Sequence, residues 1–144
     1  MKINVIFEPL KKGIKIPTKA HLNDVGYDVF CQDEEVEIEP AKTVLIKTGF
    51  KIQIPDGYWI AVCSRSGHAT KGIIVTNSPG VIDPNFRDEV GIIISNVGET
   101  VKTFRKGDKI AQLILMQKTD IEFVNGKVNT SERVGGFGSS DEKR

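Results

Sequence analysis

The chain has 144 residues, of which 39% are hydrophobic and 27% are charged, a composition that fits one globular domain and excludes a disordered chain. Lys and Arg number 20 and Asp and Glu number 19, so the formal net charge of +1 argues against direct nucleic-acid binding. No apolar run is long enough to span a membrane, and the two cysteines, Cys31 and Cys63, are too few for a disulfide scaffold.

The kinds of hydrophobic residue predict a β protein. The chain holds 18 Ile and 14 Val but only 5 Leu and 5 Ala. Branched side chains of this kind pack well on a pleated sheet and lose rotamer freedom in a helix.

Alternating apolar residues predict short strands throughout the first half of the chain. The expected strands cover residues 3–7, 14–16, 36–38, 44–46 and 50–54. Pro55-Asp56-Gly57 is a strong turn signal, after which residues 58–63 form an apolar run typical of a buried strand.

The second half of the chain continues the pattern. Residues 73–75, 90–94 and 110–116 are apolar runs of strand length, and residues 121–128 resemble a hairpin around Asn125-Gly126. One or two helical turns are expected only near residues 68–71. Many short strands and very little helix predict an all-β sandwich or barrel.

The last segment differs in composition from the rest. From residue 129 it is rich in Gly, Ser and charged residues, and its bulky apolar residues are Val134 and Phe137. We therefore expect one β domain over residues 1–128 and a flexible tail over residues 129–144.

Two segments combine residue types that suit an active site. Ser64-Arg65-Ser66-Gly67 offers a hydroxyl, a guanidinium and backbone N–H groups to an anion, although a strand end also uses such residues. Asp83 follows two apolar residues, so it is expected to be partly buried, as a general base or as a turn-capping residue before Pro84.

Two further segments carry isolated polar or aromatic groups. Gln112 lies in a run that otherwise reads as core, and its amide must find partners there, in a structural role or in a site. The tail sequence Arg133-Val-Gly-Gly-Phe-Gly-Ser-Ser140 is suited to folding over a nucleotide, or it is a plain Gly-rich terminus. His21 and His68 are expected on the surface without a role.

Five segments in this order resemble the five motifs of the trimeric dUTP diphosphatase (dUTPase) family. They are Val25-Gly-Tyr-Asp28, Ser64 to Gly67, Gly80 to Glu89, Phe104 to Gln112 and Arg133 to Ser140. The chain departs from the usual motifs at Ser64, where the family has Pro, and at Phe86 and Asp88, where it has Tyr and Gly. Its tail motif is one residue shorter, and Ser140 replaces the usual Thr.

The resemblance implies a jelly-roll-like β-barrel and a homotrimer whose active sites are shared between chains. It implies hydrolysis of dUTP to dUMP and pyrophosphate with Mg²⁺, which limits uracil incorporation into DNA and supplies dUMP for thymidylate synthesis. With no signal-peptide pattern at the N-terminus, a cytoplasmic location is expected, or the host cytoplasm if the gene is viral.

The resemblance also implies residue roles. Asp83 would deprotonate the attacking water, Gln112 would help to hold it, and Asp28 would contact Mg²⁺ through water. Phe137 would stack on uracil, and Phe86 would exclude a 2′-hydroxyl. Substrate contacts are implied for Arg65, Ser66, Gly67, Asn77, Gly80, Val81, Ile82, Asp83, Phe86, Gly91, Arg133, Phe137, Gly138, Ser139 and Ser140.

Three other functions remain open at this point. A related nucleotide deaminase acting on dCTP would need an acid near the base, for which Glu89 is the nearby candidate. A dUTP-gated regulator would bind other proteins, and a purely structural β-barrel would bind no nucleotide.

Overall fold

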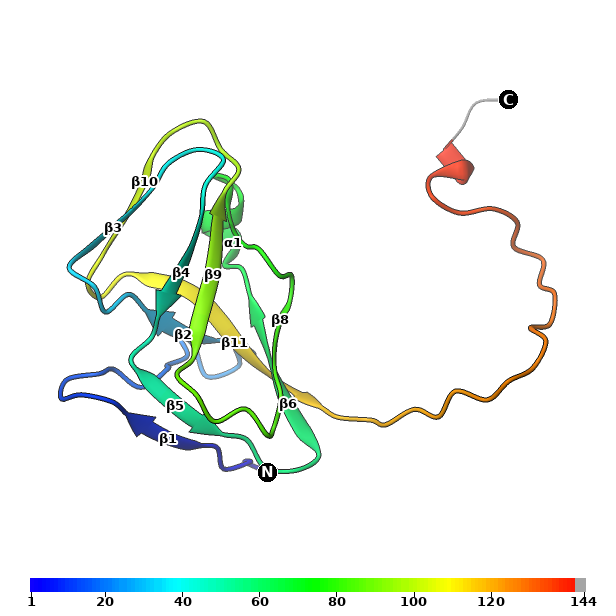
Figure 1. The fold of residues 1–144 in the computed structure, drawn as a ribbon, viewed down its shortest axis with the longest axis horizontal. Helices are drawn as coiled ribbons and strands as arrows, with labels where there is room; N and C mark the ends of the chain where they lie inside the picture. The colour runs from blue at the N-terminus through cyan, green and yellow to red at the C-terminus, as the bar shows by residue number, and fades with distance from the viewer. Residues whose placement is uncertain (142–144) are drawn as a thin grey trace.

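The computed structural model describes residues 1–141 as a β-rich body followed by an extended tail (Figure 1). The strands are β1 (Ile6–Pro9), β2 (Tyr27–Phe30), β3 (Glu35–Ile38), β4 (Thr43–Lys47), β5 (Phe50–Gln53), β6 (Tyr58–Cys63), β7 (Ile73–Val75), β8 (Gly80–Ile82), β9 (Gly91–Asn96), β10 (Lys102–Arg105) and β11 (Lys109–Gln117). The helices are α1 (Ser66–Ala69) and the 3₁₀ turn η1 (Ser139–Asp141). The predicted all-β class is confirmed.

The strands form four small antiparallel sheets. Their orders are β1-β5, β10-β3, β2-β11-β6-β8 and β4-β9-β7. In the four-stranded sheet, β11 lies between β2 and β6, and Gln112 is opposite both Asp28 and Cys63. Residues directly opposite one another project to the same face, so this register gathers polar side chains beside the end of β6.

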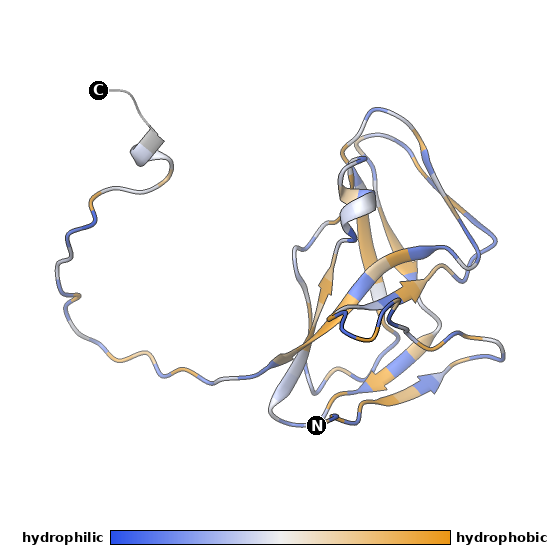
Figure 2. Ribbon diagram, turned by 180° about the vertical axis from the view of Figure 1, so that it is seen from behind, coloured by the Kyte–Doolittle hydropathy of each residue, from blue (hydrophilic) through white to orange (hydrophobic). Residues whose placement is uncertain are grey.

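One hydrophobic core is shared by these sheets. It includes Val29 of β2, Ile46 of β4, Ile92 of β9 and Phe104 of β10, all at most 1% exposed. Figure 2 shows the strands of the body mainly in hydrophobic colours, with hydrophilic loops around them. Burial of β-branched side chains on pleated surfaces is the main stabilising contribution.

The structure agrees with several predicted elements and contradicts others. The predicted strands at 58–63 and 73–75 coincide with β6 and β7, and α1 lies two residues before the predicted helical turns. Residues 14–16 form no strand, and residues 121–128 form no hairpin, so these two predictions were wrong. Ile121 and Phe123 are 73% and 91% exposed, so their alternation with polar residues does not pair them with any sheet.

The sequence interpretation missed three strands, β2, β8 and β10. β8 has only three residues and begins with Gly80, so it lacks an apolar run of ordinary strand length. β2 contains the buried Asp28, and β10 has a single buried residue, Phe104, so neither shows a clear apolar pattern. The Lys106-Gly107-Asp108 turn joins β10 to β11, but β10 pairs with β3. A long-range partner, which a local pattern does not reveal, therefore determines where β10 lies.

Candidate active site

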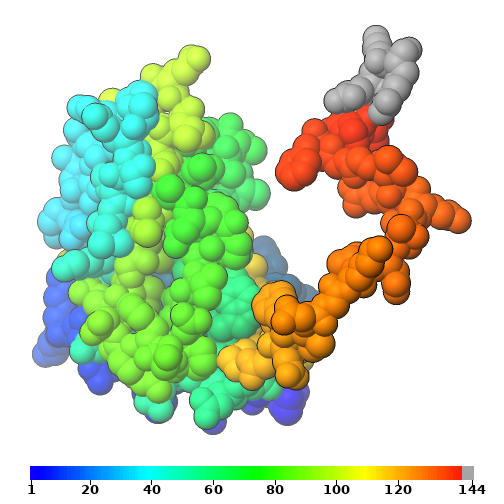
Figure 3. Space-filling view, turned by 45° about the vertical axis from the view of Figure 1, so that its right-hand side comes forward, coloured from blue at the N-terminus to red at the C-terminus, as the bar shows by residue number. Residues whose placement is uncertain are grey.

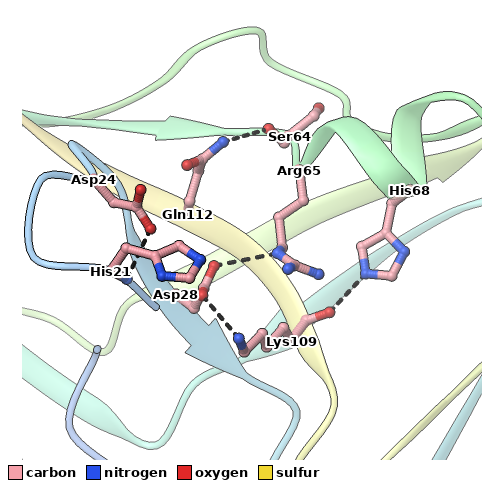
Figure 4. Close-up of polar contacts among 8 residues, drawn as sticks. All are labelled: His21, Asp24, Asp28, Ser64, Arg65, His68, Lys109 and Gln112. Carbon is pink, nitrogen blue, oxygen red and sulfur yellow. Dashed lines mark hydrogen bonds and ion pairs between the residues drawn. The ribbon is translucent and has the colours of Figure 1, made fainter. Parts of the chain in front are cut away.

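Asp28 is the centre of a charged cluster where β2, β11 and the end of β6 meet (Figure 4). Its Oδ1 atom lies 3.2 Å from Nε of Arg65, and its Oδ2 atom lies 3.2 Å from Nζ of Lys109. Asp28 is only 8% exposed. Because a buried carboxylate is costly unless it is paired, these two cations explain how β2 tolerates it.

Arg65 contacts Asp28 through Nε alone. Its side chain is one-third exposed, so the remaining guanidinium nitrogens are free to meet an anion. The predicted metal-associated residue and the predicted phosphate-binding arginine are therefore in direct contact.

Gln112 finds the partners that its position in β11 requires. Its Nε2 atom donates a hydrogen bond to the Ser64 carbonyl oxygen at 2.9 Å, and the side chain lies over Gly26. A Cβ atom at position 26 would collide with Oε1 of Gln112 and lie 2.9 Å from its Cδ atom. The glycine of the first motif thus leaves room for the glutamine of the fourth.

Ser66 and Gly67 lie in the first turn of α1, directly after Arg65. Both are exposed, and Ser64 anchors the preceding turn by accepting a hydrogen bond from the Val75 N–H at 2.8 Å. The predicted anion-binding segment is therefore held at the edge of the charged cluster.

His68 also lies in α1, and it is only partly at the surface where the sequence placed it. It is half-buried, with Nε2 2.7 Å from the Lys109 carbonyl oxygen and its ring edge-on to Phe104 at 5.2 Å. Burial lowers the pKa of His68, and the cations of Lys102 and Arg65 act in the same direction. The exposed His21 is where the sequence placed it.

A second group of predicted residues surrounds a cavity of about 100 Å³ at β8. Gly80 is buried here and closely packed. A Cβ atom added at this position would lie 3.0 Å from the Val62 Cβ atom and 3.2 Å from Nδ2 of Asn77. The lining residues are Val62, Asn77, Gly80, Val81, Ile82, Phe86, Val90, Gly91 and Ile93. Six of the residues implied for substrate contact thus share one cavity.

Asp83 follows β8 directly, next in sequence to Ile82, which lines this cavity. The sequence predicted a partly buried acid, but Asp83 is exposed, because β8 ends at Ile82 and the chain turns outward. The Asp83 carbonyl accepts a hydrogen bond from the Phe86 N–H at 3.1 Å. This turn fixes the backbone and leaves the carboxylate free.

The tail lies apart from both groups (Figure 3). After Lys118, whose N–H bonds to the Gly57 carbonyl at 2.8 Å, the chain leaves the body and is largely exposed. The ring of Phe137 is fully exposed, and Arg133 is exposed as well. Gly138 has a φ of +85°, which places Ser139 and Ser140 in the short turn η1.

Among residues 1–141, no group of three His, Cys, Asp or Glu side chains could hold a metal ion. This described part of the chain therefore offers no protein cage, and Asp28 keeps only those carboxylate lone pairs that Arg65 and Lys109 leave free. This donor set fits a cation carried mainly by substrate phosphates, which is how Mg²⁺ commonly binds in nucleotide sites.

Glu89, the acid considered for deamination, serves another purpose. Its Oε2 atom accepts a hydrogen bond from the Gly49 N–H at 2.8 Å, and it does not line the cavity at β8. This contact stabilises the start of β5 and gives no support to a proton-shuttling role.

No helix among the described residues is long and apolar enough to cross a membrane.

The sequence interpretation missed Gly26, Lys109 and His68 as site residues. Gly26 belongs to the first motif, Val25 to Asp28, so its position two residues before Asp28 could have indicated that it lies in the site. Lys109 and His68 had no such signal, because their importance comes from contacts between β11, β2 and α1.

Comparison with known proteins gives a consistent result. A family model described as dUTPase matches residues 12–141. The deoxyuridine 5′-triphosphate nucleotidohydrolase of Hydrogenobaculum sp. is 36% identical over 144 residues, covering 98% of this chain and all of that protein.

Two solved structures are similar to the fold. A mutant of the Staphylococcus bacteriophage 80alpha dUTPase with dUpNHpp is 27% identical, with a TM-score of 0.81 over 95% of this chain and 98% of that one. A mutant of the dUTPase from phage phi11 of S. aureus, described with a structural Mg(II) ion, is 24% identical, with a TM-score of 0.77 over 87% of this chain and 97% of that one.

Proposed function

Because this chain belongs to the dUTPase family, we propose that it hydrolyses dUTP to dUMP and pyrophosphate by attack of water on the α-phosphorus. The cavity at β8 is the single observation that supports this reaction most directly, since six residues implied for substrate contact line it. The reaction limits uracil incorporation into DNA and supplies dUMP for thymidylate synthesis in the cytoplasm.

Base recognition is assigned to the cavity at β8. Backbone groups of residues 80–82 meet the uracil edge, and Gly80 permits a close approach because a side chain would press on Val62. The ring of Phe86 lines the cavity and occupies the space of a 2′-hydroxyl, which rejects UTP. Asn77 and Gly91 complete the lining.

The chemical step is assigned to Asp83 and Gln112. The free carboxylate of Asp83 accepts a proton from the attacking water, which a neutral amide is unable to do. Gln112 uses one amide proton on the Ser64 carbonyl and directs the other toward the water.

The triphosphate is assigned to Arg65, Ser66 and Gly67, with Arg133 supplied by the tail. Arg65 keeps its terminal nitrogens free while Asp28 holds its Nε atom, so the guanidinium is preorganised for an anion. Phosphate contacts made in a fixed arrangement lower the barrier mainly by position and electrostatics.

Mg²⁺ is assigned to the same place, with Asp28 contacting it through water. When bound, it supplies positive charge that stabilises the leaving pyrophosphate. Support comes from the oxygen donor of Asp28 beside the phosphate-binding arginine, and from the Mg(II) ion described for the related phage enzyme.

The active enzyme is proposed to be a homotrimer in which the tail of one chain closes over a site of another. Two features support this. In one chain the charged cluster of Asp28, Arg65 and Lys109 shares no residue with the lining of the cavity at β8, and the tail lies away from both. Closure brings Phe137 onto the uracil ring and Arg133, Gly138, Ser139 and Ser140 onto the phosphates.

Pyrophosphate release measured with dUTP, dCTP, dTTP and UTP, with and without Mg²⁺, tests this function. We expect pyrophosphate release from dUTP and from none of the other three nucleotides, and only when Mg²⁺ is present. Ammonia release from dCTP would favour the deaminase instead, and equal release from all four nucleotides would contradict the assignment of the cavity at β8.

A dUTP-gated regulatory role stays a prediction that a pull-down with and without dUTP would test.

A further inference from the structure

Helix α1 carries Ser66 and Gly67 of the proposed phosphate site, yet none of its residues is buried. A helix of four residues has little intrinsic stability, so its position depends on contacts with the body. Within residues 1–141, His68 is the only residue of α1 whose side chain donates a hydrogen bond to another element.

The acceptor of this bond lies at an interruption in the sheet. The pairing of β6 with β11 ends at Cys63 opposite Gln112, so at Lys109 the strand β11 has only β2 beside it. The register of β11 on β2 also shifts between Lys109 and Ala111. The chain that leaves β6 forms α1, and His68 reaches back to the Lys109 carbonyl at 2.7 Å.

The same lysine continues the connection to the charged cluster. Nζ of Lys109 lies 3.2 Å from Asp28, and Asp28 lies 3.2 Å from Nε of Arg65. The Arg65 carbonyl then accepts the His68 backbone N–H at 3.1 Å. His68, Lys109, Asp28 and Arg65 therefore form a closed ring of contacts, of which Figure 4 marks the three made by side chains.

The orientation of the His68 ring is fixed by its surroundings. A carbonyl oxygen only accepts, so the ring donates from Nε2. The buried Phe104 meets the ring edge-on at 5.2 Å, with the interplanar angle at 87°. The ring also borders an open cavity of about 400 Å³, whose lining includes Arg65, Lys102, Asp108 and Lys109.

We propose that His68 is a positioning residue that holds Ser66 and Gly67 of α1 in register with Lys109 and Gln112 of β11. The phosphate-contacting groups of α1 and the water-holding Gln112 of β11 then keep one spacing before the substrate arrives. This inference rests on the proposed function, which assigns the triphosphate to Ser66 and Gly67 and the attacking water to Gln112.

Three substitutions separate the hydrogen bond from the space that the ring fills. His68→Leu removes the donor and keeps an apolar side chain against Phe104. His68→Asn is too short to reach the Lys109 carbonyl, whereas the Nε2 atom of a glutamine in His68→Gln has the reach to donate there. The exposed His21→Leu serves as the matched control.

The measurements are the affinities for inorganic pyrophosphate and for deoxyuridine by calorimetry, and KM and kcat for dUTP, on the full chain. For His68→Leu and His68→Asn we expect pyrophosphate affinity to fall and KM to rise by about tenfold, the scale of one hydrogen bond. Deoxyuridine affinity should stay within about twofold, as should both affinities for His68→Gln and His21→Leu.

Several results would overturn the inference. These are unchanged pyrophosphate affinity in both loss variants, an equal fall for both ligands, no recovery in His68→Gln, or no pyrophosphate binding by the wild-type chain. If His68→Leu fails to fold, as judged by its melting curve, His68→Asn decides the question. A wild-type chain that binds pyrophosphate but does not hydrolyse dUTP would contradict the proposed function and leave the positioning role standing.

Discussion

Asp83 has the most demanding proposed role at the scale of single residues, because only an ionised carboxylate can take the proton from water. The structure leaves it exposed just past β8, without a side-chain partner among the described residues. Its turn is fixed by the backbone bond from Phe86, so an isosteric amide should be accommodated without rearrangement.

Asp83→Asn should therefore keep dUTP binding and lose turnover. We expect kcat to fall by about a thousandfold, within the range of a lost general base, and KM to change by less than about threefold. Steady-state kinetics of pyrophosphate release, with a melting curve to check folding, measure both. Normal turnover in this variant would remove the assignment of Asp83 as the base.

Gly26 is a second residue whose identity matters, because the amide of Gln112 occupies the space of a side chain there. Gly26→Ala should push this amide away from the Ser64 carbonyl and lower kcat by about tenfold or more, the cost of a misplaced polar group. Gly126→Ala is the matched control, since nothing lies within 4 Å of a Cβ atom at that position. Equal kcat values for the two variants would contradict this prediction and show that turnover does not depend on the position of the Gln112 amide.

At the scale of elements, β11 organises the charged cluster. Its register places Gln112 opposite Asp28 and Cys63, and its first residue, Lys109, contacts both Asp28 and His68. The cavity at β8 depends on β6 in the same sheet, through Val62 opposite Gly80. One sheet therefore positions both groups of site residues.

The tail is the element that the body needs least for folding. Beyond Gln117 it contributes no strand to any described sheet, and from residue 121 to residue 135 it is exposed. Removing residues from Arg133 onward should leave the melting temperature within about 2 °C, because no buried contact is lost.

The same truncation should reduce kcat/KM for dUTP by about a hundredfold or more, since Arg133 and Phe137 would no longer close over the substrate. Pyrophosphate release at several substrate concentrations measures the loss. If the shortened chain kept full activity, the tail would be a passive extension and the proposed lid would be wrong.

At the scale of the whole molecule, the groups of the proposed site lie apart in one chain, and the chain exposes several apolar side chains. Leu45, Val97 and Val101 are each more than half exposed, and so is Val81 on β8 beside the cavity. Single exposed apolar residues are ordinary on a monomer, but together with a detached tail they suit a protein that assembles with its own copies.

Subunit mixing tests this assembly. Arg65→Ala and Asp83→Asn should each be inactive alone, but chains unfolded together and reassembled should recover activity. If each site takes Arg65 and Asp83 from different subunits of a closed trimer, random mixing at equal amounts restores about a quarter of the sites. Light scattering gives the mass of the assembly. No recovery in a mixture that does form trimers would show that both residues come from one chain.

Local patterns in the sequence determined a large part of this protein. The excess of Ile and Val identified the all-β class, turn residues located β6, and the ordered motifs named Asp28, Arg65 and Gln112 before their contacts were seen. Local patterns are informative here because alternate residues of a strand face the core, and because a buried amide or carboxylate must have hydrogen-bond or ionic partners.

Tertiary structure alone decided which of these residues meet. Residues 14–16 alternate like a strand but find no partner, whereas β10 is a strand because it pairs with β3. The bonds from Lys109 to Asp28 and from His68 to Lys109 join residues separated by 81 and 41 positions in the chain. The periodicity of one segment contains no information about such distant neighbours, because register and packing are settled only when separate segments share a core.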